Sequence, residues 1–277
     1  MKQTNTLTMG IALLAFLISP FLYSQENTEE PARATVLIVT TLHWNSDKTD
    51  GSPEKWLAIE KEYHEKVTMK NDLILHTNFL TRFFTADNSE SKAVSTYATW
   101  ADVESANKRT GELEEAAWPD EAKRDAFLKE RNSYYSSMHS DEIYSILGGG
   151  KYMEAKETEP MIYYVRKSHT ATPDDAVDGE MKELHTEFLE NVIYKNDYIK
   201  AYYINRHMWG ADSRDMGEVF VLNSLADVEA SFEKNTELIN AHWPDEDARK
   251  AFFEKYNRYL TGWHGDYIFQ SVPDLIK

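Results

Sequence analysis

The chain of 277 residues contains no cysteine, so disulfides, thiolate metal ligands and cysteine nucleophiles are excluded. Basic residues are also in short supply. There are 30 lysines and arginines against 47 aspartates and glutamates, which gives a formal charge of −17. Nucleic acids and anionic membrane surfaces are bound through basic faces. We therefore expect neither to be a partner of this protein.

Short catalytic motifs are missing as well. No glycine-rich phosphate loop follows a predicted strand, and neither an HExxH metal motif nor a nucleophile elbow occurs. Paired carboxylates are plentiful, but on acidic helices they are typical of solvated faces. The sequence thus predicts no metal site. Aromatic residues make up 13% of the chain, which suits either a ligand pocket or a well-packed core.

Only one long apolar run is present, from residue 9 to residue 23, and it is shorter than the roughly 20 residues of a membrane span. Lys2 precedes it and a polar, acidic stretch follows, which is the pattern of a secretory signal. We expect residues 1–24 to be the signal peptide, with cleavage after Ser24. The protein would then be periplasmic or secreted, with no stable membrane anchor. An uncleaved anchor is the alternative.

The rest of the chain is a tandem duplication. A shift of 125 positions aligns residues 35–147 with residues 160–272 without a gap. The clearest matches are Ala101-Asp102-Val103-Glu104 with Ala226-Asp227-Val228-Glu229, and Trp118-Pro119-Asp120 with Trp243-Pro244-Asp245. Residues 148–159, three glycines followed by a charged stretch, are predicted to be a flexible linker. Domains are thus expected at 35–147 and 160–272.

Each half carries the same predicted order of elements: strand, helix, two strands, helix and strand. The strands are expected at 36–44, 73–84, 93–99 and 142–147, and at 161–166, 198–209, 218–223 and 267–272. Asn71 and Asn196 suit left-handed turns that end the first helices. Thr99 and Ser224, each three residues before an aspartate, predict capping boxes. Pro119 and Pro244 are expected to interrupt the second helices and to restart them as first-turn prolines. Asp120 with Arg124, and Asp245 with Arg249, are expected to form ion pairs on the helix surface.

This order is the ferredoxin-like βαββαβ arrangement, whose sheet carries helices on one face. Apolar side chains occur on both faces of the second strand, since Phe79 and Phe83 oppose Leu80 and Phe84. The chain therefore resembles the dimeric α+β barrel superfamily in a tandem two-copy form. The resemblance implies an α+β fold in which two ferredoxin-like repeats pair their sheets into a barrel. A monomer would then suffice.

The members of that superfamily include antibiotic-biosynthesis-type monooxygenases, small lyases and isomerases, stress-response proteins and the haem-binding chlorite dismutase group. Their ligands sit between the sheet and its helices or near the barrel mouth. A fold of this kind does not by itself select an activity.

His139 and His264 are the candidate catalytic residues, because the gapless alignment matches no other histidines. Both are expected just past the second helix, and either could be an acid–base group or a haem or metal ligand. The structural alternative is that each caps the last helical carbonyls.

The candidate ligand-binding residues combine aromatic and polar groups from both copies. For the tryptophans the alternative is packing at a helix kink, and for the tyrosines it is the apolar stripe of the second helix. For the histidines and arginines of the second strand, the alternative is a hydrated barrel interior or an exposed edge in which their side chains form ordinary hydrogen bonds. The set is His76, His207, Arg82, Arg206, Trp118, Trp243, Tyr134 and Tyr259.

The sequence favours an exported protein that binds a small apolar or aromatic molecule, with a cofactor-free oxygenase or isomerase as its enzymatic form. A non-catalytic interaction or stress-associated protein is the alternative, and a haem-binding protein is a distant third. No cofactor is predicted.

Overall fold

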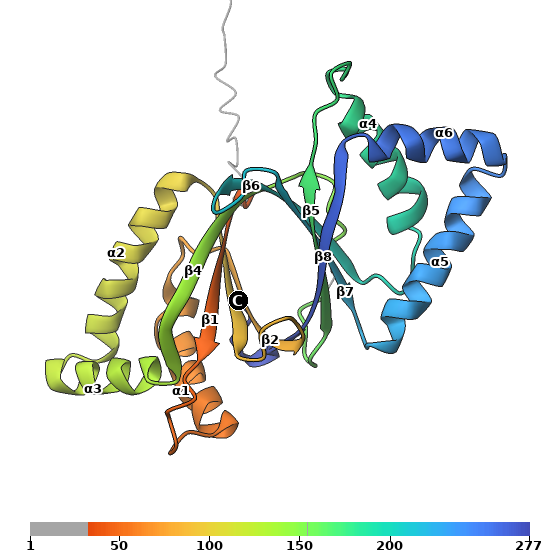
Figure 1. Cartoon of the computed structure of the whole chain (residues 1–277). Helices are drawn as coiled ribbons and strands as arrows, with labels where there is room; N and C mark the ends of the chain where they lie inside the picture. Colours follow the sequence, from red (N-terminus) through yellow and green to blue (C-terminus); the bar gives the residue numbers. More distant parts are fainter. Residues whose placement is uncertain (1–32, 154) are drawn as a thin grey trace, which may run out of the picture. The chain divides into compact units, whose positions relative to one another are not determined.

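The computed structural model describes residues 33–153 and 155–277, so the predicted signal peptide lies outside the described residues. Eight strands form one closed barrel in the order β1-β3-β2-β8-β5-β7-β6-β4 (Figure 1). Every neighbouring pair is antiparallel. The predicted α+β barrel fold is confirmed. In the described part of the chain, no helix is long and apolar enough to cross a membrane.

The order of elements is the same in the two halves. The first half contains β1 (Val36–Trp44), α1 (Pro53–Lys66), η1 (Thr68–Lys70), β2 (His76–Phe84), β3 (Glu90–Tyr97), α2 (Trp100–Ala117), α3 (Glu121–Asn132) and β4 (Tyr135–Ile146). The second contains β5 (Ile162–Thr170), α4 (Glu180–Phe188), η2 (Leu189–Ile193), β6 (Ala201–Trp209), β7 (Asp215–Leu222), α5 (Ala226–His242), α6 (Glu246–Asn257) and β8 (Leu260–Ser271), and η3 (Pro273–Leu275) follows.

The two halves are joined along two seams, where β4 pairs with β6 and β2 pairs with β8. Helices α1, α2 and α3 lie outside β1 and β4, whereas α4, α5 and α6 lie outside β5 and β8 (Figure 1). In an antiparallel barrel of eight strands, strands four places apart point the same way. Strands β1 and β5 therefore end at the same end of the barrel.

Apolar residues fill three layers. One cluster lies between the second sheet and its helices, around Leu189, Ile193 and Tyr202. Trp56 and Phe79 belong to the corresponding layer of the first half. A further cluster lies inside the barrel and combines Leu80 and Val94 of the first half with residues of the second, among them Tyr163, Val221 and Phe269. Burial of this shared interior couples the halves.

Strands β4 and β8 begin seven residues earlier than predicted, at Tyr135 and Leu260. The reason is the length of the neighbouring strand. Strand β1 runs to Trp44, and its backbone groups pair with β4 as far as Tyr135. His139 and His264 thus lie within strands, and neither caps a helix.

The helix breaks also differ from the prediction. Helices α3 and α6 are capped by Asp120 and Asp245, whose carboxylates accept from the amides of Lys123 and Ala248 at 3.1 and 2.8 Å. Each proline therefore precedes the cap and is not in the first turn. The predicted Asp–Arg pairs do not form. Arg124 and Arg249 instead donate to the carbonyls of the preceding tryptophans, Trp118 and Trp243, at 3.3 and 3.1 Å.

Asn71 and Asn196 do not adopt left-handed backbone angles, since the described non-glycine residues all have negative φ. Both are fully buried. The Asn196 amide donates to the carbonyl of Ser231 and to Asn235 Oδ1, at 2.9 and 2.8 Å, and its oxygen accepts from the Tyr198 amide at 3.0 Å. These asparagines tie the turn after each first helix to the second helix. The capping boxes at Thr99 and Ser224 are confirmed by reciprocal bonds.

The segment predicted as a flexible linker is held against the barrel. The backbone of Lys151 exchanges two hydrogen bonds with that of Tyr202. Glu157 is buried, and its carboxylate accepts from the hydroxyls of Tyr163 and Ser271. Tyr163 in turn accepts from Asn78 Nδ2 at 2.9 Å. This chain of hydrogen bonds closes the end of the barrel where β5 begins, which we call the floor.

Candidate functional site

The polar side chains of the barrel interior gather at the opposite end, where β1 and β5 end and β3 and β7 begin. We call this end the mouth. Side chains alternate along each strand, and the interior cluster identifies which set faces inward. Val165 belongs to that cluster, so Lys167 and His169 further along β5 also face inward.

Two histidines occupy equivalent positions at the mouth. In β1, His43 pairs with Glu90, and in β5, His169 pairs with Asp215. The first strands of the two repeats are thus related by a shift of 126 residues, and the other strands by 125. A gapless comparison at 125 misses this match. An alignment that allowed a one-residue gap before the first helix would have found it.

In the second repeat, the histidine lies among carboxylates. His169 Nε2 is 3.5 Å from Asp212 Oδ2 and 3.3 Å from Asp215 Oδ1. The indole ring of Trp263 stacks on the imidazole, with ring centroids 3.9 Å apart and planes at 17°. Asp215 is 2% exposed, whereas Trp263 is 46% exposed. The imidazole is therefore fixed by a stacked ring that also faces solvent.

A lysine connects the two repeats across the mouth. Lys167 Nζ lies 2.7 Å from Asp215 Oδ2 and 2.8 Å from Glu142 Oε1 on β4. Burial lowers the pKa of Lys167, but hydrogen bonds to the two carboxylates outweigh it, so the pKa is raised above its usual value. Hydrogen bonds from Arg214 lower the pKa of Asp212. Both groups are charged at neutral pH.

The first repeat uses its equivalent residues differently. His43 Nε2 is 3.2 Å from Asp87 Oδ2, and its Nδ1 is 3.1 Å from the Met138 carbonyl. Glu90 is engaged by Lys92 at 3.2 Å. The position of Trp263 is held by Met138, which offers no aromatic ring. The two walls of the mouth thus share a His–Asp pair, but only the second combines it with a further carboxylate and a stacked tryptophan.

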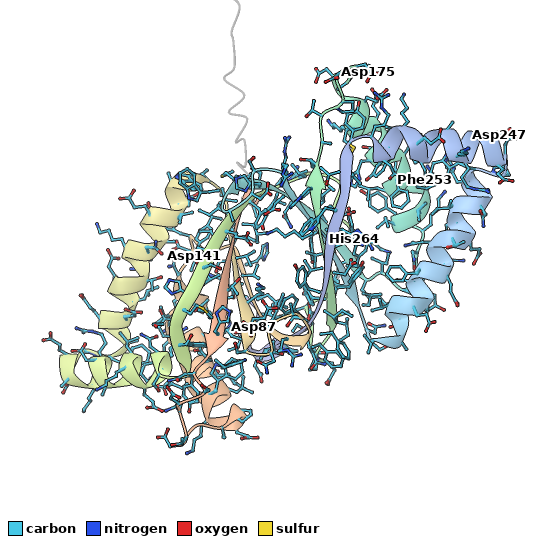
Figure 2. All side chains as sticks on the ribbon, in the orientation of Figure 1. Asp87, Asp141, Asp175, Asp247, Phe253 and His264 are labelled. Atoms are coloured by element: carbon cyan, nitrogen blue, oxygen red, sulfur yellow. The ribbon has the colours of Figure 1, made fainter. Side chains whose placement is uncertain are left out.

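Large apolar side chains surround the mouth. They come from the ends of β2 and β6 and from the beginnings of β4 and β8, and all are exposed. They are Phe83, Phe84, Met138, Met208, Trp209 and Trp263. Figure 2 shows side chains extending into the barrel opening, with Asp87 and His264 labelled on either side of it. The mouth therefore combines a charged interior with an apolar rim.

A second polar cluster lies between the sheet and helices of the second repeat. His185 Nδ1 is 2.8 Å from the Tyr256 hydroxyl, and its Nε2 is 3.5 Å from the hydroxyl of Tyr202. Tyr202 also donates to Glu218 at 2.7 Å. Burial lowers the pKa of His185 to about 4 and raises that of Glu218. His185 is therefore neutral at pH 7.

The first repeat fills the same place with an ion pair. Glu60, at the position of His185, lies 3.0 Å from Arg131, which stands at the position of Tyr256. Tyr135 donates to the same carboxylate at 3.0 Å. The first repeat thus has a charged pair where the second has a neutral one, and in both repeats the polar groups are hydrogen-bonded by neighbouring side chains.

The histidine of this layer does not fit an axial haem ligand. Both ring nitrogens of His185 face tyrosine hydroxyls, and the surrounding layer is filled by packed apolar residues. A haem would need one nitrogen free and a cavity in front of it. The layer around His185 therefore does not fit a haem.

The predicted catalytic histidines are at the surface of strands. His139 and His264 are exposed, and each lies in the N-terminal half of its strand, before the residues that pair with the other repeat. His264 Nε2 is 3.2 Å from Asp266, which also accepts from Tyr164 and Arg166. The inward-facing set of β8 contains Trp263 and Phe269, so His264 points away from the mouth. The pair remains a prediction as regards catalysis.

The structure separates the predicted strand residues. His207 and Arg82 belong to the inward-facing set near the mouth, and Arg82 lies opposite Phe269. His76 is also inward-facing but is the first residue of β2 and so lies at the floor. Arg206 is exposed and belongs to the helix-facing set with Ile204. These four side chains do not form one site.

The predicted aromatic residues pack in the helix layers. Trp118 stacks on Phe127 with centroids 4.1 Å apart, and Trp243 lies 4.2 Å from Phe252. Tyr134 and Tyr259 are buried beneath the first helices of their repeats. Their location is that of the packing alternative, outside the barrel interior.

Chemically, the mouth of the second repeat offers two possibilities. An imidazole nitrogen beside two carboxylate oxygens can exchange a proton, or the three can share a cation. Neither possibility was predicted, because Lys167, Asp212 and Asp215 carry no motif and come together only through the barrel.

Comparison with known proteins supports the fold. No protein-family model and no curated protein matches the chain. Among solved structures, a monooxygenase candidate from Fusobacterium nucleatum is 12% identical and gives a TM-score of 0.54, with 86% of this chain and 92% of that chain covered. A chlorite dismutase variant from Candidatus Nitrospira defluvii is 13% identical with a TM-score of 0.51, covering 87% and 93%. Both have the dimeric α+β barrel fold that this chain has.

Proposed function

We propose that this chain is an exported small-molecule-binding protein whose ligand lies at the barrel mouth, against the wall of the second repeat. The observation that carries the proposal is the half-exposed Trp263, stacked on His169 above a buried charged cluster. One face of the indole is covered by the imidazole, and the ring remains accessible to solvent. A stacked, accessible aromatic ring beside fixed polar groups is typical of a ligand site.

The surroundings of Trp263 define the class of ligand. The apolar rim suits an aromatic or apolar body, whereas Lys167 and the carboxylates further in suit a polar head. Lys167 is partly exposed and is held in place by Glu142 and Asp215. The proposed ligand is therefore a small molecule with an apolar or aromatic part and a polar group. Oxygenase and isomerase chemistry are the enzymatic forms of this proposal, in keeping with the monooxygenase candidate that shares the fold.

Ligand capture tests the proposal. The full-length protein is incubated with a metabolite mixture, separated from free compounds and denatured, and the retained compounds are identified by mass spectrometry. Trp263→Ala should retain at least tenfold less of the captured compound. Trp100→Ala removes an exposed indole from α2, outside the barrel, and should retain as much as the wild type. Absence of any retained compound, or equal capture by Trp263→Ala, would overturn the proposal.

Export is tested separately. Production of the full-length chain with its own leader should deliver the protein outside the cytoplasm, and its N-terminal sequence should begin near Gln25. A protein that stays in the cytoplasm with Met1 intact would contradict this part of the proposal.

A second candidate function is a non-catalytic interaction protein. The observation that favours it is the internal pairing of polar side chains in both helix–sheet layers, where His185 is hydrogen-bonded to Tyr256 and Glu60 accepts from Arg131 and Tyr135. The capture experiment separates the two, because only the first proposal requires a bound small molecule at Trp263.

A further inference from the structure

Three donor atoms converge on the second-repeat wall of the mouth. They are His169 Nε2 from β5, Asp212 Oδ2 from the turn between β6 and β7, and Asp215 Oδ1 from β7, and all lie within 4.8 Å of one another. We propose that these residues bind a divalent cation. This claim does not depend on small-molecule binding, because the three donors stand together without an organic ligand.

The spacing of the donors is that of ligands around a metal ion. Metal–nitrogen and metal–oxygen bonds of about 2.0–2.2 Å at tetrahedral angles place neighbouring ligand atoms about 3.3–3.6 Å apart. The imidazole nitrogen is 3.5 Å from Asp212 and 3.3 Å from Asp215. These separations are long for hydrogen bonds, whose usual range ends near 3.2 Å. The spacing of the three donor atoms therefore matches that of ligands around one cation.

A buried oxygen without a hydrogen-bond partner points to the same place. Among the described residues, Asp215 Oδ1 has no hydrogen-bond partner, although the side chain is 98% buried. Its other oxygen is held by Lys167 at 2.7 Å. Lys167 thus turns the free oxygen toward His169. An unsatisfied buried carboxylate oxygen is costly, and a bound cation would remove that cost.

Outer contacts fix the other two donors. Arg214 donates to both oxygens of Asp212, through Nε at 3.0 Å and a terminal nitrogen at 2.7 Å. The stacked ring of Trp263 holds the plane of His169. Supporting contacts of this kind orient ligands in metal sites. The three donors are therefore positioned before any cation arrives.

The donor set indicates which cations would bind. One imidazole and two carboxylates suit Zn²⁺ or Mn²⁺, and they leave at least one coordination position for water or a bound molecule. Asp212 is partly exposed, so the site is reached from solvent. A cation there would lie beside the proposed binding face of Trp263 and could hold the polar head of the ligand.

The first repeat supplies a matched comparison. His43 and Asp87 stand at the positions of His169 and Asp212. The third donor is missing there, because Glu90 is engaged by Lys92 and His43 uses its other nitrogen on a backbone carbonyl. We therefore expect one cation per chain, bound by the second repeat.

Isothermal titration calorimetry of the full-length protein, after removal of metals with a chelator, tests the inference with ZnCl₂ and MnCl₂. The wild type should bind one equivalent of at least one of these ions. Asp215→Asn and the more exposed Asp212→Asn should each weaken binding at least tenfold. Asp87→Asn, the equivalent change in the first repeat, should leave the affinity unchanged. Circular dichroism checks that each variant is folded.

Three results would overturn the inference: no saturable binding of either ion, equal affinities in Asp212→Asn and Asp87→Asn, or binding that persists in both second-repeat variants. Trp263→Ala distinguishes this claim from the proposed function. It should lose the captured small molecule but still bind one equivalent of cation, more weakly than the wild type, because all three donor atoms remain while the ring that orients His169 is gone. A protein that captures no compound but binds one cation would refute the proposed function alone.

Discussion

Protonation of His185 should make the protein markedly less stable in mild acid. The imidazole is buried between α4, β6 and α6, and burial lowers its pKa to about 4 from a usual 6.5. Between these two values the unfolded chain binds a proton that the folded chain does not. Above pH 6.5 His185 is neutral in both states and the free energy of unfolding is not reduced by its protonation. As the pH falls from 6.5 toward 4, the free energy of unfolding decreases.

The size of the effect follows from the shift. A difference of about 2.5 pKa units at about 1.4 kcal/mol per unit corresponds to about 3 kcal/mol lost between pH 7 and pH 4. The groups that face the ring are the hydroxyls of Tyr202 and Tyr256, with Glu218 behind Tyr202. Burial raises the pKa of Glu218, which disfavours its negatively charged form. Glu218 therefore stabilises the positive charge of a protonated His185 less than an exposed carboxylate would.

Urea unfolding of the wild type and of His185→Gln at several pH values measures the unfolding free energy that is lost when His185 is protonated. The glutamine variant keeps a neutral polar side chain. Its weaker hydrogen bond to Tyr256 should lower the free energy of unfolding by about 1 kcal/mol at pH 7. The other carboxylates titrate equally in both proteins, so the difference between them isolates His185. The wild type should lose about 3 kcal/mol more than the variant between pH 7 and pH 4. Parallel pH profiles would refute the reasoning.

Three further predictions concern the packed parts of the molecule. Asn196→Ala removes three buried hydrogen bonds and should lower the free energy of unfolding by about 3 kcal/mol, measured in urea, and Asn71→Ala should behave alike. Glu157→Ala breaks the contacts of the floor and should cost about 2 kcal/mol and speed protease cleavage in residues 148–159; unchanged cleavage would contradict this. Addition of haem should give no Soret band of a histidine-ligated haem, whereas such a band would show that the layer around His185 opens.

The duplicated fold could be predicted because each repeat carries its own local pattern. Strand β1 was predicted with its observed bounds, since its β-branched residues are bordered by polar turns. The start of β4 could not be found locally, because the mostly polar segment from Ser136 to Asp141 joins the sheet only by pairing with β1. Tertiary pairing overrides a weak strand preference here.

The candidate site was harder to predict than the fold. Lys167 and Glu142 belong to different repeats and meet only when the barrel closes. Asp212 and Asp215 lie in a turn and at the start of a strand, where acidic residues are common. The one available signal was the match of His43 with His169, hidden by a single-residue offset. By contrast, the conspicuous Trp118 and Trp243 belong to the helix layers.

The central claim is that the ligand lies at the barrel mouth of the second repeat. A crystal structure of the full-length protein with its captured compound tests this most directly. We predict density for the compound against the open face of Trp263, with its polar group directed toward Lys167 and His169. Density between the sheet and helices, with His185 released from Tyr256, would contradict it.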